Sequence, residues 1–262
     1  MPTIDKHPQG SFCWMELSTT DQNAAKQFYS SLFGWQAADF PMGPDEVYTI
    51  FRLQDKDCSA ACTLRKDLID HGVPPHWMLY IATDNVEEST RLAGELGAKV
   101  LNGPFDVGGS GRMSVIQDPT GAHFCLWQGK ETPGIGIAGE NNTFCWADLN
   151  TRDRTGAKKF YSALLGWDFQ PGPDKDDSTY LQIQNGPQMI GGMPPSEHLP
   201  PEAPPHWRLY YLTDDCAATT AKATGLGASL CVPPMEIEGA GSMSILNDPQ
   251  GAGFALFQMK MS

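Results

Sequence analysis

The chain has 262 residues, with 31 acidic and 18 basic side chains and a formal net charge of −13. This charge disfavours nucleic acid and anionic membrane surfaces as partners, because both would repel the protein. Apolar residues make up 40% of the sequence, enough for ordinary hydrophobic cores, yet no stretch approaches the roughly 18 apolar residues of a membrane span. The first eight residues lack the apolar core of a signal peptide. The seven cysteines lack the paired spacing of a zinc site, so we expect reduced thiols in a cytoplasmic protein.

The sequence is a tandem repeat. The tripeptide Phe-Cys-Trp at 12–14 recurs at 144–146, and Pro-Pro-His-Trp at 74–77 recurs at 204–207. A net shift of only two residues over this length indicates that both halves share one fold. The expected organisation is a first domain, a Gly-rich linker and a second domain, at 8–129, 130–140 and 141–259.

The first half reads as a strand, a helix and three strands, followed by the same order again. After the first strand a helix is predicted, because Ala24, Phe28 and Leu32 recur every four residues and Gly34 can end it. A second helix, ended by Gly97, follows the fifth strand. The predicted strands lie at 11–18, 35–39, 47–53, 59–64, 77–83, 99–101, 113–117 and 122–127. By repetition, the whole chain holds four βαβββ units.

Three features together resemble the vicinal oxygen chelate superfamily, which includes glyoxalase I, bleomycin resistance proteins and extradiol dioxygenases. They are the helix ending in Phe-Tyr-x-x-x-x-Gly-Trp at 28–35 and 160–167, the Asp-Pro-x-Gly turns at 118–121 and 248–251, and the four βαβββ units. Nearly the whole chain is similar to the tandem two-domain subgroup of glyoxalase/bleomycin-resistance-like proteins. The resemblance implies an α+β fold, in which two βαβββ units of each domain form one cupped mixed sheet.

Enzymes of this superfamily hold a divalent metal in the cup. The resemblance places the three ligand positions of each domain on Trp14, Trp77 and Cys125, and on Trp146, Trp207 and Ala255. Because an indole offers only an N–H and no lone pair, we predict no metal and no other cofactor in either domain. A strand register shifted by one residue would instead bring His76 and His206 into the cups.

Two carboxylates are the candidate catalytic groups. Phe12, Trp14 and Glu16 are expected on one face of the first strand, and Asp148 has the same relation to Trp146. A carboxylate beside tryptophans can have a raised pKa and act as a general base, or it can bind a cationic ligand. The alternative is a strand-end residue that reaches solvent or pairs with an arginine.

The candidate ligand-binding residues are mainly aromatic. The predicted cups contain Trp14, Trp77, Cys125 and Trp127 in the first domain and Trp146, Trp207 and Phe257 in the second. Such side chains can stack on a planar or cationic ligand, and they can equally well fill a core.

Two functions follow from this interpretation. The first is a metal-independent protein that sequesters or carries a small aromatic or cationic molecule. The second is a divergent lyase, isomerase, glyoxalase-like or hydroxylase-like enzyme that uses Glu16 or Asp148 as general base. The expected partner is a small organic molecule, and the expected state is a monomer with internal pseudo-twofold pairing, or a homodimer.

Overall fold

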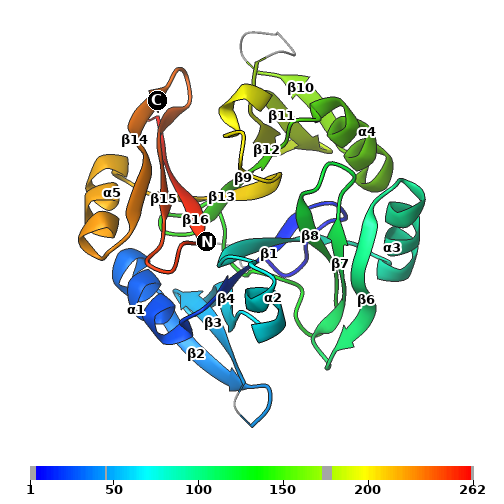
Figure 1. Cartoon of the computed structure of the whole chain (residues 1–262), viewed down its shortest axis with the longest axis horizontal. Coiled ribbons are helices and arrows are strands. Elements are labelled where there is room, and N and C mark those ends of the chain that lie inside the picture. The colour runs from blue at the N-terminus through cyan, green and yellow to red at the C-terminus, as the bar shows by residue number, and fades with distance from the viewer. Residues whose placement is uncertain (1–3, 45, 173–178, 261–262) are drawn as a thin grey trace.

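The structure is a computed structural model that describes residues 4–44, 46–172 and 179–260. Each half forms one eight-stranded mixed sheet, in the order β2-β3-β4-β1-β5-β8-β7-β6 and β10-β11-β12-β9-β13-β16-β15-β14 (Figure 1). The predicted α+β tandem duplication is therefore confirmed. Residues 1–3, which belong to the segment interpreted as lacking a signal peptide, lie outside the described residues. Within the described ranges, no helix is long and apolar enough to cross a membrane.

The first half contains the predicted order of elements and one additional short helix, α2. Its elements are β1 (Phe12–Thr19), α1 (Gln22–Phe33), β2 (Gln36–Pro41), β3 (Val47–Leu53), β4 (Lys56–Thr63), α2 (Lys66–Asp70), β5 (His76–Ala82), α3 (Val86–Glu95), β6 (Lys99–Val107), β7 (Gly111–Gln117) and β8 (His123–Gly129).

The second half repeats this order, with a 3-10 turn in place of α2. Its elements are β9 (Phe144–Asn150), α4 (Arg154–Leu165), β10 (Asp168–Pro171), β11 (Leu181–Asn185), β12 (Gln188–Met193), η1 (Ser196–His198), β13 (His206–Leu212), α5 (Cys216–Gly225), β14 (Ser229–Ile237), β15 (Gly241–Asn247) and β16 (Gly253–Met259).

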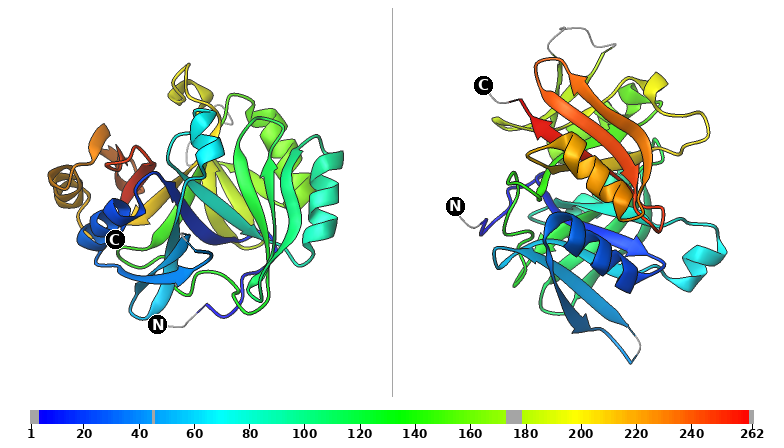
Figure 2. Two further views of the ribbon diagram at one scale, coloured as in Figure 1. Left: turned by 60° about the horizontal axis from the view of Figure 1, so that its bottom comes forward. Right: turned by 90° about the vertical axis from the view of Figure 1, so that its left-hand side faces the viewer.

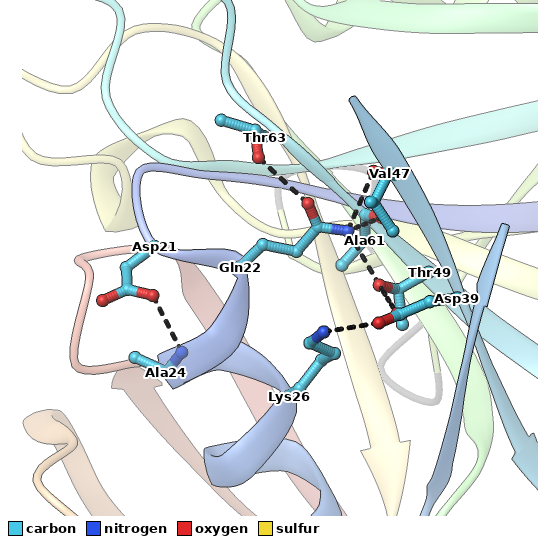
Figure 3. Close-up of polar contacts among 9 residues, drawn as sticks. All are labelled: Asp21, Gln22, Ala24, Lys26, Asp39, Val47, Thr49, Ala61 and Thr63. Atoms are coloured by element: carbon cyan, nitrogen blue, oxygen red, sulfur yellow. Dashed lines mark hydrogen bonds and ion pairs between the residues drawn. The ribbon is translucent and has the colours of Figure 1, made fainter. Parts of the chain in front are cut away.

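The start of α1 is held by side chains that satisfy polar groups of the adjacent sheet. Asp21 is the N-cap, and its Oδ1 accepts a hydrogen bond of 2.9 Å from the amide of Ala24 (Figure 3). Gln22 donates from Nε2 to the Thr49 hydroxyl at 2.7 Å and to the Ala61 carbonyl at 3.0 Å. These bonds fix the helix against strands β3 and β4.

One face of each sheet packs against helices and the other half of the chain, and we call it the helix face. Trp77 lies on this face, where its indole N–H donates to the Tyr29 hydroxyl of α1 at 3.2 Å. Tyr29 in turn donates to Asp248 of the second half at 3.0 Å, and Tyr161 donates to Asp118 of the first half at 2.8 Å. Helices α1 and α5, from different halves, lie side by side (Figure 2). The two halves therefore share one buried core.

Candidate functional site

Glu16 lies in the middle of the first sheet, on the face opposite Trp77, which we call the site face. Its cross-strand neighbours are Ala60 on β4 and Met78 on β5. Trp14 lies on the same face, opposite Tyr80. The site face of the second sheet is the one that carries Asp148.

The Glu16 carboxylate accepts hydrogen bonds from surrounding side chains of three strands. The Tyr48 hydroxyl donates to Oε2 at 2.7 Å, and the Trp14 indole N–H donates to the Tyr48 oxygen at 2.8 Å. The Tyr80 hydroxyl donates as well, and the Cys62 thiol lies 3.8 Å from Oε1. We call Trp14, Glu16, Tyr48 and Tyr80 the first carboxyl cluster.

The second half repeats this arrangement around Asp148. The hydroxyls of Tyr180 and Tyr210 donate to its carboxylate at 2.6 and 2.8 Å. The indole N–H of Trp146 lies 2.7 Å from the Tyr180 oxygen and 3.2 Å from Asp148 Oδ1. These four residues form the second carboxyl cluster, which has the same chemistry as the first.

Both carboxyl groups hold their protons more tightly than an exposed acid does. Burial raises the pKa of Glu16, and the hydrogen bonds from Tyr48 and Tyr80 offset this only in part. Burial raises the pKa of Asp148 in the same way, against the hydrogen bonds from Tyr180 and Tyr210. A buried carboxyl with a raised pKa can exchange a proton with a bound molecule nearer to neutral pH than an exposed one can.

The strand register corrects the predicted position of two tryptophans. Trp77 pairs with Leu17 and Trp207 pairs with Leu149, so both indoles point away from the carboxyl clusters. The Trp207 N–H donates to the Tyr161 hydroxyl at 3.2 Å, as Trp77 does to Tyr29. The prediction that these tryptophans line the cups was wrong by one residue, and successive residues of a strand face opposite ways. They belong to the core between the halves.

The same register places the preceding histidines on the site faces. His76 pairs with Ser18, two residues from Glu16, and His206 pairs with Asn150, two residues from Asp148. The Nδ1 of each histidine bonds to the backbone carbonyl two residues earlier, Pro74 or Pro204. Burial and the nearby Arg208 lower the pKa of His206 to about 4, so this ring is neutral at pH 7.

Phe12 also differs from its predicted position. The pairing of β1 with β5 shifts by one residue between Phe12 and Trp14. This irregularity turns the Phe12 ring toward the second half, where it packs edge-on against Trp167 and Trp207 at ring distances of 5.6 and 5.5 Å. Phe12 therefore does not share a face with Glu16.

The last strand of each sheet adds the remaining predicted residues. Cys125 pairs with Tyr80, and Ala255 pairs with Tyr210, so both lie on the site faces. Trp127 is two residues beyond Cys125; its N–H donates to the Thr132 carbonyl at 3.0 Å. In the second half the corresponding residue is the half-buried Phe257, listed by its strand pairing opposite Met243.

The sequence interpretation missed four tyrosines, although the repeat contains a signal for them. Tyr48 and Tyr180 are 132 residues apart, and Tyr80 and Tyr210 are 130 residues apart, the two offsets of the repeat itself. Each tyrosine lies 32 to 64 residues from its carboxyl in sequence, so only the sheet brings them together. Polar residues retained at both repeat offsets are the signal that would have identified them.

The positions that the superfamily uses for a metal do not suit one here. The indole N–H groups of Trp14 and Trp146 point at tyrosine oxygens. Burial raises the pKa of the Cys125 thiol well above its ordinary value, which opposes the thiolate that a metal requires, and Ala255 has no donor atom. In the described part of the chain, no three His, Cys, Asp or Glu side chains are grouped closely enough to hold a metal ion.

Comparison with known families matches both halves. Residues 11–126 match the Glyoxalase/Bleomycin resistance protein/Dioxygenase superfamily, and residues 146–257 match a glyoxalase-like domain. Over 261 residues the chain is 36% identical to the Mycobacterium tuberculosis protein named "Putative glyoxylase CFP32", covering 98% of each chain. It is 30% identical to the anthracycline biosynthesis protein DnrV of Streptomyces peucetius, covering 96% of this chain and 94% of that one. The chain therefore belongs to the glyoxalase/bleomycin resistance/dioxygenase superfamily, also called the vicinal oxygen chelate superfamily.

Solved structures share the fold at low identity. The Mn(II)-bound glyoxalase of Novosphingobium aromaticivorans aligns with a TM-score of 0.67 and 15% identity, over 95% of this chain and 82% of that one. The 2,3-dioxygenase LapB of Pseudomonas sp. KL28 aligns with a TM-score of 0.67 and 12% identity, over 97% and 94%. At these identities the likeness concerns the architecture alone.

Proposed function

We propose that this protein binds a small organic molecule, aromatic or cationic, on the site faces of its sheets and does so without a metal. The observation that carries this proposal is the duplication of one polar cluster. A tryptophan, two tyrosines and a carboxyl occur in both halves, joined by hydrogen bonds of 2.6 to 2.8 Å around Tyr48 and Tyr180. Aromatic rings beside a carboxyl suit a planar molecule that carries a hydrogen-bond donor or a positive charge.

The relatives support an aromatic ligand in particular. One of them is named for anthracycline biosynthesis, and anthracyclines are planar polycyclic molecules. In the first cluster Glu16 has no arginine opposite it, since Met78 occupies the neighbouring strand position. A cationic group near Glu16 would favour the ionised carboxylate and would gain from that charge.

The direct test is a binding titration with an anthracycline, followed by the fluorescence of the anthracycline itself. We expect Glu16→Gln to weaken binding about tenfold, because the variant keeps the shape of the side chain and loses its charge. Asp70→Asn is the matched control, since it removes an acid from the exposed α2. Equal affinity in wild type and Glu16→Gln would refute a role for this carboxyl in binding.

A second candidate function is proton transfer, as in a lyase or an isomerase, with Glu16 or Asp148 as general base. The raised pKa of both carboxyls favours it, because a base works best when its pKa lies near the working pH. Turnover of a glyoxalase substrate by the purified chain would be lost in Glu16→Gln or Asp148→Asn while substrate affinity stayed within about twofold. A pure binding protein would show no turnover in any variant.

We further propose that the protein acts in the cytoplasm as a monomer, with a homodimer as the alternative. The hydrogen bonds from Tyr29 to Asp248 and from Tyr161 to Asp118 already pair two domains within one chain. Native mass spectrometry of protein purified without a metal-affinity step reports subunit number, any retained ligand and any metal together.

A further inference from the structure

The second carboxyl cluster contains a positive charge that the first lacks. Arg208 is the cross-strand neighbour of Asp148 on the site face, and Met78 is the cross-strand neighbour of Glu16. These two residues correspond by the 130-residue offset of the repeat. The halves therefore present different chemistry at the same place on the sheet.

Arg208 is positioned by neutral groups. Its Nη1 donates to Asn150 Oδ1 at 3.1 Å, and it also donates to the Tyr210 hydroxyl. The Nδ1 of His206 is 2.9 Å from the Pro204 carbonyl, which can only accept, so Nδ1 carries the proton. The lone pair of His206 Nε2 is then free to accept from Arg208 Nη2 at 3.1 Å. The histidine orients the guanidinium without neutralising it.

The charge of Arg208 is not cancelled by a close carboxylate. Among the described residues, the ion pairs within 4.0 Å involve other arginines and lysines, and Arg208 forms none of them. Asp148 is its neighbour, but burial favours the protonated form of that carboxyl. The guanidinium is half-buried, so part of it remains reachable from solvent. A partly buried cation of this kind is typical of a site for an anionic group, which the planar guanidinium binds with two parallel hydrogen bonds.

We infer that Arg208 makes the second half selective for an aromatic molecule that bears a carboxylate, whereas the first half, with Met78, takes an uncharged or cationic one. This inference rests on the proposed function, because it names the class of ligand for one of the two clusters. A single negative charge suits the site better than two. The nearby Asp148 and the net charge of −13 both oppose a phosphate dianion.

The test uses three probes that share one ring system: 2-naphthoate, 2-naphthamide and 2-naphthyl phosphate. Their binding to the full chain is measured by isothermal titration calorimetry. We expect the wild type to bind naphthoate about tenfold more tightly than naphthamide. Arg208→Met, which copies the first half, and Arg208→Gln should each remove this preference and leave the naphthamide affinity within about twofold. Arg91→Met, on the exposed face of α3, is the control and should change neither affinity.

The outcomes separate the inference from the proposed function. If naphthoate and naphthamide bind equally to the wild type, or if the preference survives in both Arg208 variants, the inference is overturned and aromatic binding stands. Tighter binding of naphthyl phosphate than of naphthoate would overturn the assignment of a carboxylate. If neither naphthoate nor naphthamide binds, both the proposed function and the inference are overturned. Thermal melting of the two variants shows that each is folded.

Discussion

The two halves of this chain share their skeleton and differ in the surroundings of one carboxyl group. Each sheet presents a carboxyl that accepts from two tyrosine hydroxyls, at Glu16 and at Asp148. Around Glu16 the neighbouring strands contribute Met78 and Ala60; around Asp148 they contribute Arg208 and Gly192. The difference teaches that duplication has kept the central hydrogen-bonded cluster and changed the groups that contact it.

The core between the halves shows no such divergence. Trp77 donates to Tyr29 and Trp207 donates to Tyr161, both at 3.2 Å, and each tyrosine donates to an aspartate of the other half. Packing of this kind makes each half depend on the other, because neither buries its tryptophan by itself. The shared core therefore limits change, whereas the site faces are open to it.

The largest expected effect comes from removing a tryptophan of this core. Trp77→Ala should lower the free energy of unfolding by about 4 kcal/mol, as deletion of a large buried aromatic side chain generally does, and Trp207→Ala should cost the same. Urea denaturation followed by circular dichroism measures both. Because the core is shared, a single transition should move to lower urea in each variant. Two separate transitions, one of them unchanged, would show that the halves are independent.

The next effect concerns the reciprocal hydrogen bonds between the halves. Tyr29→Phe should cost about 2 kcal/mol of stability, because it leaves a carboxylate oxygen of Asp248 and the Trp77 N–H without their partner. Tyr161→Phe should cost a similar amount. Urea unfolding of both variants compares the two contacts directly, and a large difference between them would contradict their equivalence.

The carboxyl clusters predict an unusual dependence of stability on pH. Burial raises the pKa of Glu16 and Asp148 in the folded state, so between the unfolded and the folded pKa the folded protein keeps a proton that the unfolded chain has released. Their contribution to the free energy of unfolding therefore falls as pH rises, by about 1.4 kcal/mol for each unit of pKa shift.

Glu16→Gln and Asp148→Asn cannot ionise at these positions, so each variant should be more stable relative to wild type at pH 8 than at pH 4. Urea unfolding at both pH values measures this difference. An advantage that is larger at pH 4 would show that the folded-state pKa is lowered instead. The exposed Asp70→Asn variant serves as control and should show no such trend.

The smallest effect comes from a single methyl group in the second half. A side chain at Gly192 would place its Cβ 1.9 Å from the Tyr180 hydroxyl, so Gly192→Ala must displace that tyrosine from Asp148. We expect a loss of about 1 kcal/mol and a further rise in the pKa of Asp148, because the hydrogen bond from Tyr180 lowers it. Urea unfolding and carbon NMR of the carboxyl measure these changes.

Gly225→Ala is the matched control for this substitution, because nothing lies within 4 Å of the added methyl group. It should not lower stability, since alanine favours a helix more than glycine does. If Gly192→Ala leaves the pKa of Asp148 unchanged, Tyr180 is not held over that glycine. The first half carries Ala60 at this position, so the comparison isolates a real difference between the clusters.

The sequence by itself determined the duplication, the order of strands and helices, and the superfamily. Repeats, the four-residue spacing of Ala24, Phe28 and Leu32, and the Asp-Pro-x-Gly turns act over short distances, so they can be recognised without the fold. The carboxyls Glu16 and Asp148 were also identified, because each lies two residues from a tryptophan on one strand.

Only the tertiary structure decided which side chains meet those carboxyls. A strand alternates its faces with every residue, so an error of one residue moved Trp77 from the core to the cup and hid His76 from it. Tyr48 and Tyr80 reach Glu16 from other strands, through sheet pairing that no local pattern encodes. Periodicity fixes each strand separately, whereas a site is made by the register between strands, and that register is set by packing of the whole core.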